Sequence, residues 1–497
     1  MNTLIYQSTR NTSIKADPSA AVLKGLAEDG GLFVPEEIPE LPMTLSALAG
    51  LSYEELAFQI LRLFLTDYPE SELKECIHLA YGQNFDVPGI APLVKKAGSF
   101  YLELFHGRTI AFKDMALSIL PHLMTRAAGR MGAKEEIVIL TATSGDTGKA
   151  ALAGFADVPG TRIMVFYPKD GVSEVQKLQM VTQKGGNVEV VGVEGNFDDC
   201  QAGVKQIFHD AKLKETLMGK GFRLSSANSI NIGRLVPQIV YYIYAYGQLM
   251  ASGEIREGDE INVCVPTGNF GNILAAFYAR QMGLPIKKLI SASNENKVLY
   301  DFFRTGSYDR NRKFVLTSSP SMDILVSSNL ERLIFHISGE DAEKTGELMQ
   351  SLTNKGRYEI TEDMRKKLDC FEAGFATEED TQKEIRRVYE ESGYVLDPHT
   401  AVASFVADSL LKEGRVDGSV PMVIASTASP YKFARAVLYG IEGEGSKESD
   451  MELVGRLSEK TGLSEPEAVS KLRGAEILHD KTIPASGMEE AVLGFLR

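Results

Sequence analysis

Lys113 stands in a setting that could make a lysine chemically reactive. It lies between Phe112 and Asp114 and is followed by the apolar run 115–117. Apolar surroundings disfavour the charged ammonium, so they lower the pKa of a lysine towards the neutral, nucleophilic amine. The alternative is an exposed helix residue paired with Asp114, which is what most lysines in proteins are. The sequence thus offers a candidate for a lysine that forms a Schiff base.

Two glycine-rich segments further along the chain could bind anions. Residues 143–148 read Thr-Ser-Gly-Asp-Thr-Gly, and residues 266–272 read Pro-Thr-Gly-Asn-Phe-Gly-Asn. We expect each between a strand and a helix, where backbone N–H groups can converge on a phosphate or carboxylate at the helix N-terminus. Each segment taken alone could also be a turn followed by an ordinary helix cap.

The first loop does not match the common nucleotide-binding motifs. Gly148 and Lys149 are reminiscent of a nucleotide P-loop, but Ala150 stands where that loop needs a magnesium-binding Ser or Thr. No Gly-x-Gly-x-x-Gly follows a predicted strand, which weakens a dinucleotide interpretation. A reactive lysine followed by two anion-binding loops indicates instead a pyridoxal-phosphate (PLP) enzyme, in which the lysine binds the cofactor aldehyde and the protein holds the phosphate.

The elements that must position these residues alternate between strand and helix from about residue 136 onwards. Alternation of short β-branched runs with helical segments predicts parallel sheets that are covered on both faces. In such sheets ligands bind at the carboxyl ends of the strands, where both glycine-rich loops fall. The predicted strands are 137–142, 161–167, 188–193, 222–226, 261–265, 288–292 and 422–425, and the predicted helices are 147–155, 173–184, 197–213, 231–250 and 271–282.

The chain is expected to form three domains. Helical spacing of apolar residues dominates the first part, so residues 1–95 are predicted to be a mainly helical N-terminal domain. Residues 96–230 would form a smaller α/β domain that carries Lys113, and residues 231–497 a larger α/β domain. Within the larger one, residues 339–392 are dense in charged side chains at helical spacing and predict a solvated helical insertion.

Composition excludes several classes of function. A formal net charge of -14 over 497 residues disfavours nucleic acid as a partner. The four cysteines lie far apart without a Cys-x-x-Cys pair, which predicts no metal site and suits a reducing, cytoplasmic compartment. Residues 1–10 carry no apolar signal stretch. Residues 236–250 are apolar but broken by proline, glutamine and tyrosines, so a buried helix is expected and not a membrane span.

At this point the chain resembles the threonine synthases of the longer bacterial and fungal type, which are fold-type II PLP enzymes. The resemblance implies an α/β fold with two parallel-sheet domains, an additional N-terminal mainly helical domain and a helical insertion. Segments 28–39 and 320–329 are the most particular to threonine synthases, whereas the two glycine loops are shared widely among fold-type II enzymes. The resemblance runs through residues 28–39, 111–114, 143–148, 228–234, 265–275, 291–296, 320–329 and 397–402.

The resemblance also implies roles for individual residues. Lys113 would bind the cofactor aldehyde, and Thr427 would face the pyridine nitrogen with a hydroxyl that does not force this nitrogen to be protonated. The PLP phosphate would be held by Gly268, Asn269, Phe270, Gly271 and Asn272, and the substrate carboxylate by Ser144, Asp146 and Thr147. Arg234 is a candidate for a substrate anion, with a surface arginine at a helix start as the alternative.

The implied reaction converts O-phospho-L-homoserine and water to L-threonine and phosphate, the last step of threonine biosynthesis. Two alternatives remain open: another PLP lyase (a serine/threonine dehydratase or an O-phosphohomoserine phospho-lyase), and a PLP-binding protein without turnover. A monomer or a homodimer is expected. The sequence departs from the usual threonine-synthase pattern at Ser429 and at residues 231–234, close to the expected pocket. Asp397 and Pro398 read most simply as the start of a helix, with Asp397 as its N-cap.

Overall fold

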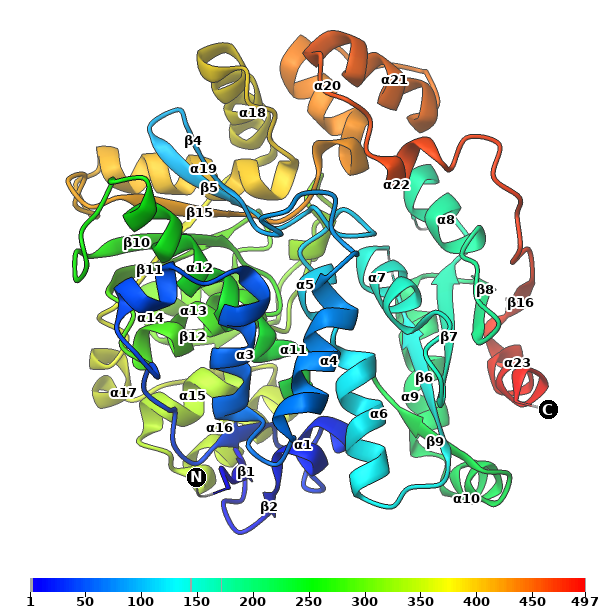
Figure 1. The fold of residues 1–497 in the computed structure, drawn as a ribbon. Coiled ribbons are helices and arrows are strands. Elements are labelled where there is room, and N and C mark those ends of the chain that lie inside the picture. Colours follow the sequence, from blue (N-terminus) through cyan, green and yellow to red (C-terminus); the bar gives the residue numbers. More distant parts are fainter. Residues whose placement is uncertain (1–2, 144, 171, 497) are drawn as a thin grey trace.

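The structure, a computed structural model, describes residues 3–143, 145–170 and 172–496. Its main elements are two sheets with helices on their faces (Figure 1). A small antiparallel sheet of β1 (Tyr6–Ser8), β2 (Lys15–Ala16) and β3 (Phe33–Pro35) lies near the N-terminus. The α/β class with parallel sheets that the sequence predicts is confirmed.

The larger sheet has six strands in the order β14-β11-β10-β15-β5-β4. All neighbouring strands are parallel except β4, which pairs antiparallel with β5 at one edge. The predicted strands at 261–265, 288–292 and 422–425 are confirmed. The bounds are β4 (Leu93–Lys96), β5 (Ser99–Glu103), β10 (Ile261–Pro266), β11 (Ile286–Ser293), β14 (Phe371–Phe375) and β15 (Met422–Ser426).

The smaller sheet has five parallel strands in the order β16-β8-β7-β6-β9. Its central strands are buried, as their β-branched and aliphatic sequences require in a sheet covered on both faces. The bounds are β6 (Glu136–Ala142), β7 (Thr161–Pro168), β8 (Val188–Glu194), β9 (Phe222–Ser225) and β16 (Thr482–Pro484).

Helices on the sheet faces are mostly where the sequence predicts them, but two of the expected helices are divided. The expected helix at 197–213 consists of α9 (Phe197–His209) and the start of α10 (Ala211–Gly219), with Asp210 in an extended conformation between them. The expected helix at 231–250 consists of α11 (Ile232–Leu235) and α12 (Pro237–Ala251), because Pro237 has no N–H to continue a helix and suits a first position instead. Most of α12 is buried, as expected for this apolar segment. Among the described residues, no helix is both long and apolar enough to span a bilayer.

The N-terminal region is mainly helical, as predicted. Its helices are α1 (Pro18–Lys24), α2 (Leu45–Ala49), α3 (Tyr53–Phe64) and α4 (Glu70–Tyr81). Ser52 and Glu55 form a capping box that starts α3, in which each side chain accepts from the other's backbone N–H. The apolar face of α3 then packs into the core against α12.

The charged segment 339–392 contains strands as well as the expected helices. Its helices are α16 (Ala342–Lys355), α17 (Glu362–Lys366) and α18 (Glu378–Ser392), and its strands are β13 (Arg357–Glu359) and β14. β14 is the edge strand of the larger sheet, so this part of the chain is not a purely solvated insertion. The sequence of β14, Phe-Glu-Ala-Gly-Phe, has no β-branched residue, and Glu, Ala and Gly are depleted in strands, so it gives little strand signal between the charged helices.

The division of the chain at residues 95 and 230 stays a prediction. The strands β4 and β5 belong to the larger sheet, although most of residues 96–230 builds the smaller one. The late strand β16 returns to the smaller sheet, next to β8. Each α/β unit therefore takes strands from both sides of the expected boundaries.

Candidate functional site

The segment that carries Lys113 is fastened to the end of a central strand of the larger sheet. Phe112 N donates to Thr427 O at 2.8 Å, and Ala111 and Ala428 form a β-bridge. Thr427 follows β15 directly, so these bonds bring Lys113 to the carboxyl end of the sheet. The short helix α5 (Asp114–Leu117) begins immediately after the lysine.

The Lys113 amine lies in a buried polar cluster. Its Nζ donates to Ser321 Oγ at 3.0 Å and lies 3.6 Å from Asp146 Oδ2. Burial lowers the pKa of Lys113, and the attraction of Asp146 only partly offsets this effect. Asp114 instead accepts from Thr109 N at 2.8 Å. Lys113 is therefore not an exposed lysine paired with its neighbour, and its surroundings favour the nucleophilic amine.

Asp146 is an ionised carboxylate at the start of α7 (Asp146–Phe155), the helix that follows β6. Its Oδ1 lies 3.0 Å from Lys432 Nζ and accepts from Gln176 Nε2 at 2.9 Å. Burial alone would raise the pKa of Asp146, but Lys432 and then Lys113 outweigh this effect and hold it well below its usual range. The negative charge of Asp146 is thus balanced mainly by Lys432, the nearer of the two lysines.

Lys432 comes from the larger α/β unit. Its side chain is fully buried and Nζ also donates to Thr109 O at 2.7 Å. The residue lies in the 3₁₀ turn η2 (Pro430–Phe433), which Ser429 caps by accepting from Tyr431 N at 3.4 Å. Ser429, one of the departures noted in the sequence, therefore has a local structural role here.

The first glycine-rich loop is organised by its own threonine. Thr143 Oγ1 accepts from Gly145 N and Gly148 N, both at 3.0 Å. Among the described residues of the loop, the backbone N–H groups that remain are those of Asp146 and Thr147, which as the first residues of α7 have no acceptor within the helix. Thr147 is partly buried. Ser144 lies outside the described residues.

The second loop leads from β10 into α13 (Gly271–Gln281). Phe270 holds a left-handed backbone with φ of 65°, and its ring packs against Phe303 and Phe371 in the core. Only the backbone of Phe270 can therefore face a ligand. Asn269 is exposed and accepts from Ser328 Oγ at 3.3 Å.

Asn272 and Gly271 begin α13 and differ in what surrounds them. The buried Asn272 accepts from Tyr241 Oη at 2.8 Å and also from Tyr242, while its Nδ2 has no hydrogen-bond partner among the described residues. A Cβ added at Gly271 would find its nearest neighbour, Asn329 Nδ2, at an ordinary 3.5 Å. The protein itself does not require a glycine at this position, as expected if a ligand approaches the backbone there.

Gly268 differs from Gly271 because it backs onto another loop. A Cβ at Gly268 would lie 2.7 Å from Ser321 O and 3.3 Å from the Cα of Met322. The second glycine-rich loop (266–272) and the segment that contains Ser321 (320–329) are therefore in direct backbone contact.

Arg234 in α11 is buried without a counter-charge. Its Nη1 donates to Ala227 O at 2.9 Å, its Nε has no partner, and among the described residues no carboxylate pairs with it. Burial lowers the pKa of Arg234 to about 10. Arg234 is therefore not a surface arginine. A buried guanidinium of this kind is available for an anion.

Three segments that resemble threonine synthases meet at the fully buried Arg332. Its Nε donates to Phe33 O at 2.9 Å and its Nη2 donates to Ile230 O at 2.6 Å, while Nη1 donates to Asn329 Oδ1. Arg332 thus joins segments 28–39, 228–234 and 320–329. One buried side chain therefore connects three segments that carry the resemblance, including the two that are most particular to threonine synthases.

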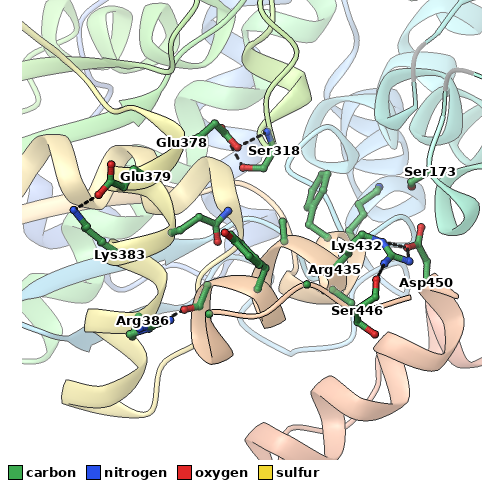
Figure 2. Close-up of a pocket in the computed structure, with 18 of the residues that line it drawn as sticks. Ser173, Ser318, Glu378, Glu379, Lys383, Arg386, Lys432, Arg435, Ser446 and Asp450 are labelled. Carbon is green, nitrogen blue, oxygen red and sulfur yellow. Dashed lines mark hydrogen bonds and ion pairs between the residues drawn. The ribbon is translucent and has the colours of Figure 1, made fainter. Parts of the chain in front are cut away.

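A cleft of about 970 Å³ borders the Lys113 cluster. Figure 2 shows α18 on one side and the segment from Lys432 to Ser446 on the other, with Asp450 of α21 (Asp450–Thr461) nearby. Ser318 lines the cleft and donates through N and Oγ to Glu378, at 3.1 and 3.3 Å. Because Lys432 lines the cleft and contacts Asp146, the cleft reaches the wall of the buried cluster.

Four residues of this cluster were not singled out by sequence reasoning. Ser321, His399 and Lys432 belong to segments that carry the resemblance or lie next to one, but nothing in their spacing along the chain marks them as neighbours of Lys113. The fourth, Gln176, is a helical residue in α8 (Glu174–Val181). They are Ser321, His399, Lys432 and Gln176.

The arrangement fits PLP on features of this chain alone. Lys113 supplies a buried amine of lowered pKa for an aldehyde. The start of α13 supplies backbone N–H groups beside Gly271, where a side chain would occupy the space that a phosphate needs. Thr427, which contacts the Lys113 segment, supplies a hydroxyl at the end of β15.

Comparison with protein families gives three matches along the chain. Residues 5–81 match the family model described as threonine synthase N terminus, and residues 400–477 match threonine synthase, C-terminal. Residues 86–427, more than half of the chain, match the family described as pyridoxal-phosphate dependent enzyme.

Individual relatives agree with these matches. A threonine synthase from Pseudomonas aeruginosa is 41% identical over 87% of this chain and 89% of its own length. Threonine synthase-like 1 from Pongo abelii is 45% identical over 85% of this chain, and the match spans 58% of that longer protein. The PLP-bound threonine synthase structure from Brucella melitensis superposes with a TM-score of 0.87 at 37% identity, over 100% of both chains.

Proposed function

The chain belongs to the threonine synthase family of PLP-dependent enzymes, and from that premise we propose that it converts O-phospho-L-homoserine and water to L-threonine and phosphate. Its cofactor is PLP. The observation that carries the proposal is the 3.0 Å contact between Lys113 Nζ and Ser321 Oγ. It brings the candidate cofactor lysine into contact with segment 320–329, on which the resemblance to threonine synthases depends most.

The roles of the cofactor-binding residues are part of this proposal. Bound PLP withdraws electrons from the carbon atoms of the attached amino acid and so stabilises carbanions. Lys113 would hold the cofactor aldehyde, and its amine, whose pKa burial lowers, would be suited to accept the Cα proton of the substrate. The 268–272 loop holds the phosphate, through backbone N–H groups and through the unpaired Asn272 Nδ2. Thr427 would supply a hydroxyl to the ring nitrogen.

The substrate brings two anionic groups, and the proposed sites differ in kind. Asp146 and Thr147 line the carboxylate site at the start of α7, where the helix N-terminus favours an anion. Ser144 is assigned to the same site by the resemblance alone. Asp146 would repel a carboxylate if it stood alone, but its ion pair with Lys432 offsets this charge. Arg234 binds the phosphate in a planar, two-point fashion, which its buried and uncompensated charge supports.

We further propose a cytoplasmic location, because all four cysteines are buried thiols without a disulfide. Whether the protein is a monomer or a homodimer stays a prediction.

Phosphate release from O-phospho-L-homoserine by the purified, PLP-loaded protein tests the proposal. We expect steady release by the natural sequence and none by Lys113→Ala at equal protein concentration. Lack of release by the natural sequence would contradict the reaction class. Release accompanied by 2-oxobutyrate and ammonia, in place of L-threonine, would assign a phospho-lyase instead.

A further inference from the structure

Ser321 lies between the two charged groups at the centre of the site. Its Oγ accepts from Lys113 Nζ at 3.0 Å and donates to Asp146 Oδ2 at 3.4 Å. The residue belongs to the 3₁₀ turn η1 (Pro320–Met322) in the loop between β12 (Ser307–Asp309) and α15 (Leu330–Ser338). A serine from a distant loop therefore makes the shorter of the two polar contacts that the Lys113 amine has with Ser321 and Asp146.

The chemistry of a hydroxyl fixes the direction of these bonds. Serine has a single O–H proton, and ionised Asp146 can only accept it, so a lone pair of Oγ is left for Lys113. Lys113 then directs one N–H to Ser321 and another towards Asp146, which lies 3.6 Å away. With two positions of the nitrogen occupied, its lone pair has one preferred direction.

Ser321 is itself held by a buried pair on α19 (Pro398–Lys412). Its backbone N donates to His399 Nε2 at 3.1 Å, and His399 Nδ1 donates to Asp397 Oδ1 at 2.7 Å. A backbone N–H can only donate, so Nε2 carries the lone pair and the proton is on Nδ1, an assignment that follows from the partners. Asp397 also caps α19, as the sequence predicts. The same carboxylate therefore holds both the start of the helix and the imidazole of His399.

The opposite side of the same loop is closed by amide and carboxylate side chains. Asn294 Nδ2 and Asn296 Nδ2 each donate to Asp323 Oδ1 at 2.8 Å, and Thr317 N donates to Asp323 Oδ2 at 3.0 Å. These bonds tie the loop to the end of β11. The Ser321 turn is thus fixed from two directions, so its hydroxyl has a defined position relative to Lys113.

We propose that Ser321 is a catalytic residue that orients the Lys113 amine, and that His399, anchored by Asp397, is the positioning residue that holds Ser321 in place. The proposal rests on the assignment of Lys113 within the proposed function. In the step concerned, the Lys113 nitrogen forms a C=N bond to the PLP aldehyde carbon. Two amine protons leave with the aldehyde oxygen as water, so atoms and charges balance. Orientation of the attacking lone pair is what Ser321 contributes.

The test measures how fast Lys113 captures PLP, a step that needs no amino-acid substrate. The full-length protein is freed of cofactor, mixed with PLP, and followed through the visible absorption of the lysine-bound cofactor. We expect Ser321→Ala to capture PLP about tenfold more slowly, in line with loss of one orienting hydrogen bond to a reacting group. Ser318→Ala is the matched control, because its hydroxyl lies on the same loop and contacts Glu378, and it should stay within about twofold.

His399 variants separate positioning from a general structural role. His399→Gln keeps an acceptor for Ser321 N and should restore capture to within about threefold, whereas His399→Met should be as slow as Ser321→Ala. In the Ser321→Ala background, His399→Met should add less than about twofold, because it acts through Ser321. If the double variant captured PLP more slowly by the product of the two single-variant factors, the positioning role of His399 would be contradicted.

A rate for Ser321→Ala within about twofold of the natural sequence overturns the proposal. If that variant fails to fold, Ser321→Cys keeps the side-chain size with a weak acceptor and carries the same expectation, while Ser321→Thr should retain the rate. The proposed reaction can fail separately: normal capture of PLP on Lys113 without threonine formation would refute the reaction and leave the role of Ser321 intact.

Discussion

Asp146 and Lys432 form an ion pair of 3.0 Å in which the lysine side chain is fully buried. Asp146 begins a helix of the smaller α/β unit, whereas Lys432 follows the last central strand of the larger one. The pair therefore joins the two units directly beside Lys113. The interaction energy of this pair therefore contributes to the stability of the contact between the two units at the site.

A double-mutant cycle on Asp146 and Lys432 should show strong coupling. Lys432→Met leaves the buried Asp146 carboxylate without its nearest positive charge, and Asp146→Asn leaves the buried Lys432 without its negative partner. Each change should therefore lower the free energy of unfolding by about 2–4 kcal/mol. The double variant should recover at least about 1.5 kcal/mol of the summed losses. Urea unfolding of the PLP-free protein measures this without a contribution from cofactor affinity.

The surface pair Lys412–Asp408 is the matched control for this cycle. It joins the same residue types at i and i+4 with the lysine side chain 72% exposed. Its coupling should stay below about 0.5 kcal/mol. Equal coupling in the two cycles would mean that burial adds nothing to the pair at the site.

Alanine at Gly268 and at Gly271 should have different consequences. At Gly268 the new Cβ would clash with Ser321 O at 2.7 Å, so the cofactor-free protein should be destabilised by about 1–3 kcal/mol. At Gly271 the nearest atom would be 3.5 Å away, so stability should hold while PLP binding weakens by about tenfold or more. Urea unfolding and equilibrium PLP titration separate the two effects. Unchanged PLP affinity in Gly271→Ala would remove that residue from the phosphate site.

Lys113 should carry the cofactor. The purified protein should absorb in the visible range, and Lys113→Ala should lose this band while keeping its far-ultraviolet circular dichroism. Borohydride reduction followed by peptide mapping should find the pyridoxyl group on Lys113. Lys149 and Lys432 are the informative competitors, because both are close enough to influence the same cluster. A pyridoxyl group on either one would overturn the assignment.

Lys149 should reduce stability in a pH-dependent way. Burial lowers its pKa to about 7, and its Nζ donates only to the neutral Gln183 Oε1, at 2.5 Å, among the described residues. The unfolded chain then binds more protons between about pH 7 and 10, so stability rises with pH in this window, and the penalty is complete below pH 7. Lys149→Met should therefore raise the free energy of unfolding by about 1–3 kcal/mol at pH 6 and by less at pH 9.5.

The exposed Lys134 provides the control for this pH dependence. Lys134→Met should change stability by less than about 0.5 kcal/mol at either pH. A gain for Lys149→Met that is the same at pH 6 and pH 9.5 would show that the ammonium is not the cause.

Local pattern was enough to predict most of the secondary structure. The β-branched run at 137–142 lies in β6 (Glu136–Ala142), and Asp397 caps α19 as its position before Pro398 indicates. Such features depend on neighbouring residues, so the sequence contains the information directly. The strand β14 was not predicted because its sequence Phe-Glu-Ala-Gly-Phe has no β-branched residue and lies within a charge-rich segment, and β16 because it has only three residues.

The site could be predicted only where a local sequence motif contains the functional residues. Lys113 and the two glycine loops are recognisable because their chemistry is local. The contacts of Lys113 with Ser321, and of Asp146 with Lys432, depend on how two sheets and a long loop come together. No spacing in the sequence fixes such distances, and the tautomer of His399 follows from partners that only the fold provides.

The product formed in isotopically labelled water tests the central claim most directly. A threonine synthase must retain the unsaturated substrate, exclude bulk water and admit one water molecule to Cβ. PLP-loaded protein given O-phospho-L-homoserine in ¹⁸O water should therefore form L-threonine with the label on the Cβ hydroxyl, in amounts equal to the phosphate released. If 2-oxobutyrate matched the phosphate and labelled threonine were absent, the protein would be a phospho-lyase and the proposed function would be wrong.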